Sequence, residues 1–209
     1  QGFPENWIAA LACATFAMIL RGVSSPGEPW WTVGLGISIC LLLAALSLTS
    51  RRRGFIYLAA LSLNYTATRF YFWLDLERSD LFRDVYAYPP AVVSLNAIVL
   101  ALPAIAWLAI DLKFLRQDGA QSITPFHRVA ALISLGLLSL ALFFQWSSYV
   151  SGSSQVIGEV LLDWFALASV VALLVACLRD ERSAYAMRGL HIVGLIATGM
   201  ALLSFNPGS

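Results

Sequence analysis

Long apolar runs and short polar connections alternate over the whole chain. Each run is close to the roughly 20 residues that a helix needs to cross the hydrocarbon core of a membrane. Seven runs can be marked, at residues 7–23, 30–49, 54–74, 91–112, 129–147, 157–178 and 189–205. Within a run the apolar residues are continuous and do not alternate with polar ones, which favours helices over strands. The pattern therefore predicts an all-α fold, a polytopic transmembrane helix bundle of about seven spans.

The connections between the runs are too short to hold a second folded unit. The segment "SSPGEP" has two prolines and a glycine, which is typical of a turn, and "SRRRG" allows only a tight connection. No internal repeat separates one part of the chain from another. We expect a single transmembrane helical domain over residues 1–209, and this domain can be a fragment or the membrane domain of a longer protein.

Composition supports a membrane class and argues against nucleic acid. Hydrophobic residues make up 59% of the chain, and charged residues only 12%, about half of the roughly one quarter found in soluble domains. The lipid bilayer is therefore the first expected partner. A net charge of +1, without a basic stripe or a zinc-finger pattern, predicts no nucleic-acid partner.

Basic residues set the expected orientation of the bundle. If the N-terminus is cytoplasmic, nine of the 13 basic residues fall in cytoplasmic connections: Arg51, Arg52, Arg53, Lys113, Arg116, Arg128, Arg179, Arg182 and Arg188. Only Arg21, Arg78 and Arg83 fall outside. Because cytoplasmic loops carry the excess of Lys and Arg, we expect the N-terminus inside and the C-terminus outside. We expect the chain to be an integral membrane protein of the bacterial cytoplasmic (inner) membrane.

A polar stretch inside the third run raises the question of a site. "SLNYTATRFYFWLD" begins at Ser62 and carries several polar side chains in an apolar context. At the helical rise of 1.5 Å per residue, Arg69 lies in the outer third of its span. Polar residues of three later spans lie at a similar depth, namely Asn96, Gln145 and Asp163. Polar side chains in hydrocarbon normally face the bundle interior. The sequence therefore predicts a ligand-binding or structural polar cluster made of Asn64, Thr68, Arg69, Asn96, Gln145 and Asp163.

Two interpretations of this cluster stay open. Arg69 and Asp163 have opposite charges at a similar depth, so they are predicted to pair, which would offset part of the cost of burying each charge. In the other interpretation Arg69 extends its guanidinium to the lipid headgroups. The Asn and Thr side chains then make ordinary hydrogen bonds between helices.

Few residues suggest catalysis or a bound metal. His127 and His191 lack an evident third ligand, so the sequence assigns no metal site. Cys13, Cys40 and Cys177 lie inside apolar runs and are expected to be small buried residues. Lys113, the only lysine, lies at a cytoplasmic end, which excludes a retinal-binding lysine inside the bundle. The sequence assigns no catalytic residue, and the cofactor stays unknown.

Three functions from different classes remain. The first is a non-enzymatic subunit or membrane domain of a larger assembly, with other membrane subunits as partners. The second is a small-solute transporter or an outward-facing sensor that uses the polar cluster. The third and least favoured is an intramembrane enzyme, because no pair of a nucleophile and a base can be drawn from the sequence.

Overall fold

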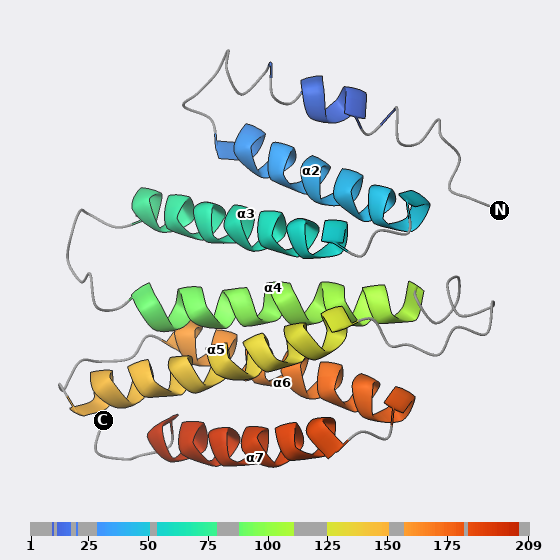
Figure 1. Ribbon diagram of the computed structural model, residues 1–209. Coiled ribbons are helices and arrows are strands. Elements are labelled where there is room, and N and C mark those ends of the chain that lie inside the picture. The colour runs from blue at the N-terminus through green and yellow to red at the C-terminus, as the bar shows by residue number, and fades with distance from the viewer. Residues whose placement is uncertain are drawn as a thin grey trace. The chain divides into compact units, whose positions relative to one another are not determined.

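Helices make up all of the chain that the structure describes. The computed structural model describes residues 10, 12–17, 20, 29–50, 54–78, 88–110, 125–150, 157–181 and 184–204, and every one of them is helical. The long helices in this part are α2 (Pro29–Ser50), α3 (Gly54–Arg78), α4 (Tyr88–Ile110), α5 (Pro125–Val150), α6 (Ile157–Glu181) and α7 (Ala184–Ser204) (Figure 1). The all-α prediction is confirmed for the described residues.

Five of these helices are long and apolar enough to cross a membrane, and they indicate an integral membrane protein. They contain the spans Trp30–Thr49, Pro90–Ile110, Phe126–Ser147, Val160–Leu178 and Tyr185–Leu203. The predicted span at residues 54–74 forms α3, but its polar residues keep α3 out of this group. The predicted span at residues 7–23 lies mostly outside the described residues. A count of seven spans therefore stays a prediction.

Proline marks the start of several helices. α2 and α5 begin at Pro29 and Pro125, and α4 has Pro89 and Pro90 in its first turn. Proline suits this place because the first backbone N–H groups of a helix have no partner within it. Pro103 lies inside α4. There it removes the N–H that would otherwise bond to the carbonyl of the residue four positions earlier, yet the helix continues to Ile110.

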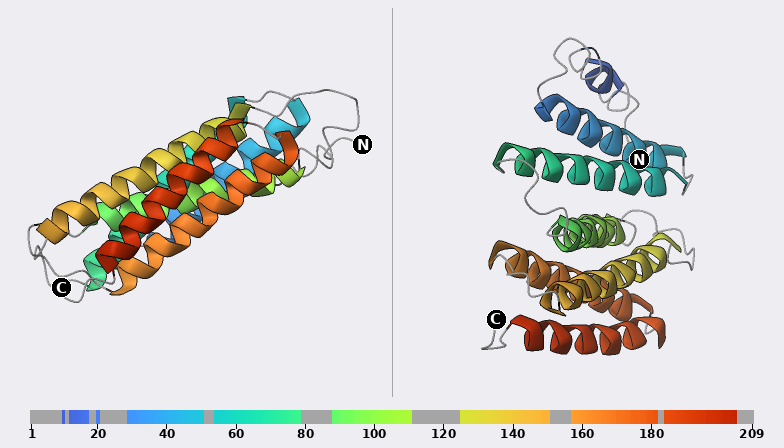
Figure 2. Two further views of the ribbon diagram at one scale, coloured as in Figure 1. Left: turned by 90° about the horizontal axis from the view of Figure 1, so that it is seen from below. Right: turned by 90° about the vertical axis from the view of Figure 1, so that its left-hand side faces the viewer.

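The described helices belong to two compact units, residues Gln1–Leu81 and Phe82–Ser209. In the first unit α2 packs along α3. In the second unit α5 and α6 contact each other, and both contact α4 on one side and α7 on the other (Figure 2). Each unit is described by itself, so the expectation of one domain over residues 1–209 stays a prediction.

A glycine lets α2 and α3 approach closely. Gly36 of α2 is buried, and a Cβ atom built there would lie 1.8 Å from Thr66 Oγ1 of α3. The Ser62 hydroxyl donates a hydrogen bond to the Gly36 carbonyl oxygen at 3.3 Å. Small residues at a helix contact allow the backbones to come near one another, as is common between membrane helices. Ser62 and Thr66 of the polar stretch thus have a packing role.

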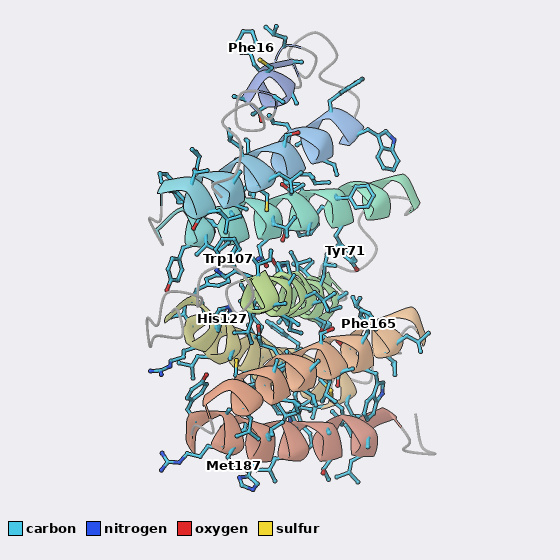
Figure 3. The ribbon with its side chains drawn as sticks, turned by 90° about the vertical axis from the view of Figure 1, so that its right-hand side faces the viewer. Phe16, Tyr71, Trp107, His127, Phe165 and Met187 are labelled. Carbon is cyan, nitrogen blue, oxygen red and sulfur yellow. The ribbon has the colours of Figure 1, made fainter. Side chains whose placement is uncertain are left out.

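The unit of α4–α7 has small residues inside and large apolar residues outside. Its buried interior includes Ala97, Ala101, Ala104, Ala130, Ala131, Ala141 and Ala166. Large apolar side chains are exposed on its surface, among them Leu132, Phe143, Leu161, Phe165, Leu195 and Leu202. Figure 3 shows Phe165 and Met187 on the outside of this unit. Such a continuous apolar exterior would be unfavourable in water, but it suits contact with lipid chains.

Candidate functional site

A buried carboxyl group joins three helices of the second unit. Asp163 of α6 is only 2% exposed, Ser94 of α4 is 0% exposed and Gln145 of α5 is 4% exposed. The Ser94 hydroxyl donates a hydrogen bond to Asp163 Oδ1. The Gln145 Nε2 group donates a hydrogen bond to the other carboxyl oxygen, Oδ2. We call Ser94, Gln145 and Asp163 the carboxyl trio.

The helix directions bring the trio to one level of the unit. Ser94 lies six residues after the start of α4, and Asp163 lies six residues after the start of α6. Gln145 lies five residues before the end of α5. At 1.5 Å per residue, all three lie about 8–9 Å from the same end of the unit. Antiparallel packing of α5 against α4 and α6 therefore places the three side chains together.

The surroundings of the trio make its hydrogen bonds important for stability. The buried residues one turn from the trio on the same helices are apolar and offer no side-chain hydrogen-bond partner: Ala91, Ala97, Ile98, Ala141 and Ala166. A buried donor that loses its acceptor costs about 1–3 kcal/mol. Gln145 Oε1 is also buried, and it has no hydrogen-bond partner among the described residues. The trio thus has two satisfied donors and one amide oxygen that can still accept a hydrogen bond or bind a cation.

The structure brings together two of the six residues predicted for the cluster, Gln145 and Asp163. Similar depth in neighbouring spans was the signal that selected them. Ser94, the third member, was missed because a single serine in an apolar run is common and inexpensive. Its position six residues into α4 matches the position of Asp163 in α6, and this match of depths was the signal that could have found it.

The other predicted residues behave differently. The side-chain amides of Asn64 and Asn96 each donate to the backbone carbonyl four residues earlier in their own helix, to Ala60 O at 2.9 Å and Val92 O at 2.8 Å. Thr68 is half-buried on α3, and Arg69 is exposed. Because α3 belongs to the first unit, a common cluster of α3 residues with Asp163, and the pairing of Arg69 with Asp163, stay predictions.

More buried polar groups lie toward the opposite end of the second unit. Trp107 of α4 and His127 of α5 lie near the point where α4 ends and α5 begins (Figure 3). His127 is fully buried. Trp107 Nε1 and Ser134 Oγ have no hydrogen-bond partner within the described part of the chain. At a level between these groups and the trio lie Leu138 and Val170, both fully buried and apolar.

The three cysteines and the two histidines all lie in the part of the chain that the structure describes. No group of three or more His, Cys, Asp or Glu side chains that could hold a metal ion occurs there. Cys40 is half-buried, Cys177 is buried and Cys13 is exposed, so the expectation of burial is confirmed in full only for Cys177.

Comparison with known proteins adds no relative to this description. No protein-family model matches the chain, and no match was found among the curated proteins or the solved structures.

Proposed function

We propose that this chain is an integral membrane protein that serves as a non-enzymatic subunit or membrane domain of a larger assembly. The observation that carries this proposal is an exposed stripe on α3, formed by Leu58, Leu61, Tyr65, Arg69 and Phe72. We call these five residues the α3 stripe. Its spacing of three or four residues puts all five side chains on one face of the helix.

The α3 stripe combines groups that a lipid environment satisfies poorly. Leu61 is 67% exposed and Tyr65 is 63% exposed, and the exposed Arg69 follows one turn later. Charged groups within the hydrocarbon layer are costly unless they find a partner. Interfaces between proteins favour such a mixture of aromatic side chains and arginine. A helix of another membrane subunit would supply acceptors for Arg69 and the Tyr65 hydroxyl, and apolar contact for the remaining side chains.

Photo-crosslinking in native membranes tests this role. A photoreactive residue placed at Tyr65 should give adducts with a second protein, at one or a few discrete masses. The matched control is the same residue at Phe165 of α6, which is 58% exposed and whose exposed neighbours on that face, Leu161 and Ala168, are apolar; it should label lipid. Equal yields of protein adducts at the two positions would count against the subunit role.

The topology belongs to the same proposal. We propose seven spans in the bacterial cytoplasmic membrane, with the N-terminus inside, supported by the excess of Lys and Arg in the connections assigned to the cytoplasm. Single cysteines at Arg52 and Arg83, in a chain whose own three cysteines are replaced, should react with a membrane-impermeant reagent only at position 83. Labelling of position 52 in intact cells would contradict the orientation.

A second candidate function is a small-solute transporter or an outward-facing sensor. The specific observation that favours it is the carboxyl trio, because an ionisable side chain within a membrane span is costly and commonly marks an ion or substrate site.

A further inference from the structure

We infer that the carboxyl trio binds one small positive charge, a proton or an alkali-metal ion, between α4, α5 and α6. The inference rests on the contacts of Ser94, Gln145 and Asp163 and does not depend on the proposed subunit role. It deepens the second candidate function by naming the class of ligand.

The first argument is charge. An ionised carboxylate in a low-dielectric interior is costly unless a positive charge lies beside it. Besides Asp163, the described titratable side chains of the unit are His127, Arg128 and Tyr149 on α5, Cys177 on α6, and Tyr185, Arg188 and His191 on α7; the described side chains of α4 include none. The four basic residues among them lie toward the end of the unit opposite the trio. Only Tyr149 lies at the same end, and it is 39% exposed.

The two donors of the trio do not replace that charge. Ser94 and Gln145 are neutral, so their hydrogen bonds orient the carboxyl group without cancelling its charge. A proton or a monovalent cation makes the trio neutral overall. A divalent ion would leave one positive charge in the same apolar interior, because the trio contains a single carboxylate.

The second argument is the unused oxygen of Gln145. Oε1 is buried without a hydrogen-bond partner among the described residues, while Nε2 faces Asp163. The two ends of a side-chain amide have nearly the same shape. A half-turn of this amide therefore brings Oε1 toward the carboxyl group with little change in packing.

Each ligand then has a consistent binding geometry. A proton taken from water converts the carboxylate to a carboxylic acid, whose O–H can donate to Gln145 Oε1. An alkali-metal ion would be bound by Asp163 and Gln145 Oε1, with the Ser94 hydroxyl oxygen as a third ligand, since hard cations prefer oxygen. No bond to carbon changes, and no electron is transferred.

Thermal unfolding of the purified protein in neutral detergent tests the inference. One series lowers the pH from about 8 to about 5 in choline chloride, above the range in which an unfolded aspartate titrates. The other series replaces choline by sodium or by potassium at fixed pH and constant ionic strength. A ligand that binds only the folded state should raise the melting temperature by about 3–6 °C for each tenfold increase above its dissociation constant.

The matched variant is Asp163→Asn, which keeps the shape of the side chain and removes its charge. A wild-type response to pH that Asp163→Asn lacks identifies a proton. A response to sodium or potassium that the variant lacks identifies an alkali-metal ion. Both histidines remain in this variant, so a response caused by them would persist. Equal responses of the two proteins, or no response of the wild type in either series, would overturn the inference.

A second variant keeps the test decisive if Asp163→Asn does not fold. Ser94→Ala preserves the carboxyl group and Gln145 but removes one hydroxyl from the trio. The ligand concentration at which the melting temperature begins to rise should change by about tenfold in this variant. A factor of this size corresponds to the loss of one hydrogen bond to a charged group. His191→Gln, which alters an exposed side chain of α7, should leave this concentration unchanged. A Ser94→Ala protein that responds like the wild type would contradict the inference.

Discussion

The two units of this protein differ in what links their helices. On α2 and α3 the side chains of Thr49, Asn64 and Thr66 each donate to a backbone carbonyl four residues earlier in the same helix. In the unit of α4–α7, Ser94 and Gln145 donate to a carboxyl group on a third helix. Local bonds also occur in the α4–α7 unit, at Asn96 and Thr198, but the carboxyl group of Asp163 gives that unit a side-chain link between helices.

The difference shows what determines helix packing in each unit. A bond to the backbone of the same helix exerts no constraint on a neighbouring helix. α2 and α3 are positioned instead by the close contact of Gly36 with Thr66, together with the bond from Ser62 to the Gly36 carbonyl. In the other unit, the trio fixes the level at which α4, α5 and α6 meet, because sliding one helix would strand a buried donor.

The largest expected effect is the loss of the shared carboxyl group. Asp163→Ala should lower the free energy of unfolding by about 2–5 kcal/mol, since it strands the Ser94 hydroxyl and the Gln145 amide in an apolar interior. Unfolding in mixed detergent micelles measures this loss. A loss below about 0.5 kcal/mol would show that the trio does not hold the unit together.

A smaller loss is expected from crowding the contact between α2 and α3. Gly36→Ala should cost about 1–3 kcal/mol, because the new methyl group meets the stiff, β-branched Thr66. Gly136→Ala is the matched control, since a Cβ atom on this α5 residue would meet nothing within 4 Å. The control should be neutral or slightly stabilising through helix propensity. Equal losses in the two variants would contradict the close contact.

The smallest effects are expected where the side-chain bond is local. Asn64→Ala should change the free energy of unfolding by less than about 0.5 kcal/mol, because alanine favours the helix and the lost bond joins the side chain to its own helix. The same micelle assay measures this variant. A loss near that of Asp163→Ala would mean that the Asn64 amide links helices after all.

The sequence-based hypothesis of an ion pair between Arg69 and Asp163 can be separated from the role of the trio. A true pair predicts that Arg69→Ala and Asp163→Ala together cost clearly less than the sum of their separate losses. Neutralisation by a small bound charge within the α4–α7 unit predicts losses that add to within about 0.5 kcal/mol. A double-mutant cycle in the micelle assay decides between them.

Much of the fold follows from hydrophobic patterning, and part of the site follows from depth. The apolar runs predicted the helices at α2, α4, α5, α6 and α7, because a helix that crosses hydrocarbon needs a continuous apolar segment. Equal depth in neighbouring spans brought Gln145 and Asp163 into one group, and the structure places them in direct contact.

The remaining features depend on side-chain conformation and on the facing helix, which patterning does not specify. The side-chain amide of an asparagine in a membrane helix can donate to the backbone of its own helix or to a neighbouring helix. The sequence around Asn64 and Asn96 does not distinguish these two cases. Gly36 could be recognised as a close contact only once Thr66 was known to face it. Ser94 is important because it bonds to Asp163; the two residues share a depth, but a single serine in an apolar run does not by itself predict such a bond.

The most direct test of the account is a double-mutant cycle for Gln145 and Asp163, with the free energy of unfolding in mixed micelles as the readout. Gln145→Ala and Asp163→Ala should together cost about 1–2 kcal/mol less than the sum of the single losses, because each single variant already breaks the shared hydrogen bond. A cycle of Asp163→Ala with Thr198→Ala, whose hydroxyl bonds to its own helix, should be additive. Strict additivity for Gln145 and Asp163 would contradict the carboxyl trio as the link between α5 and α6.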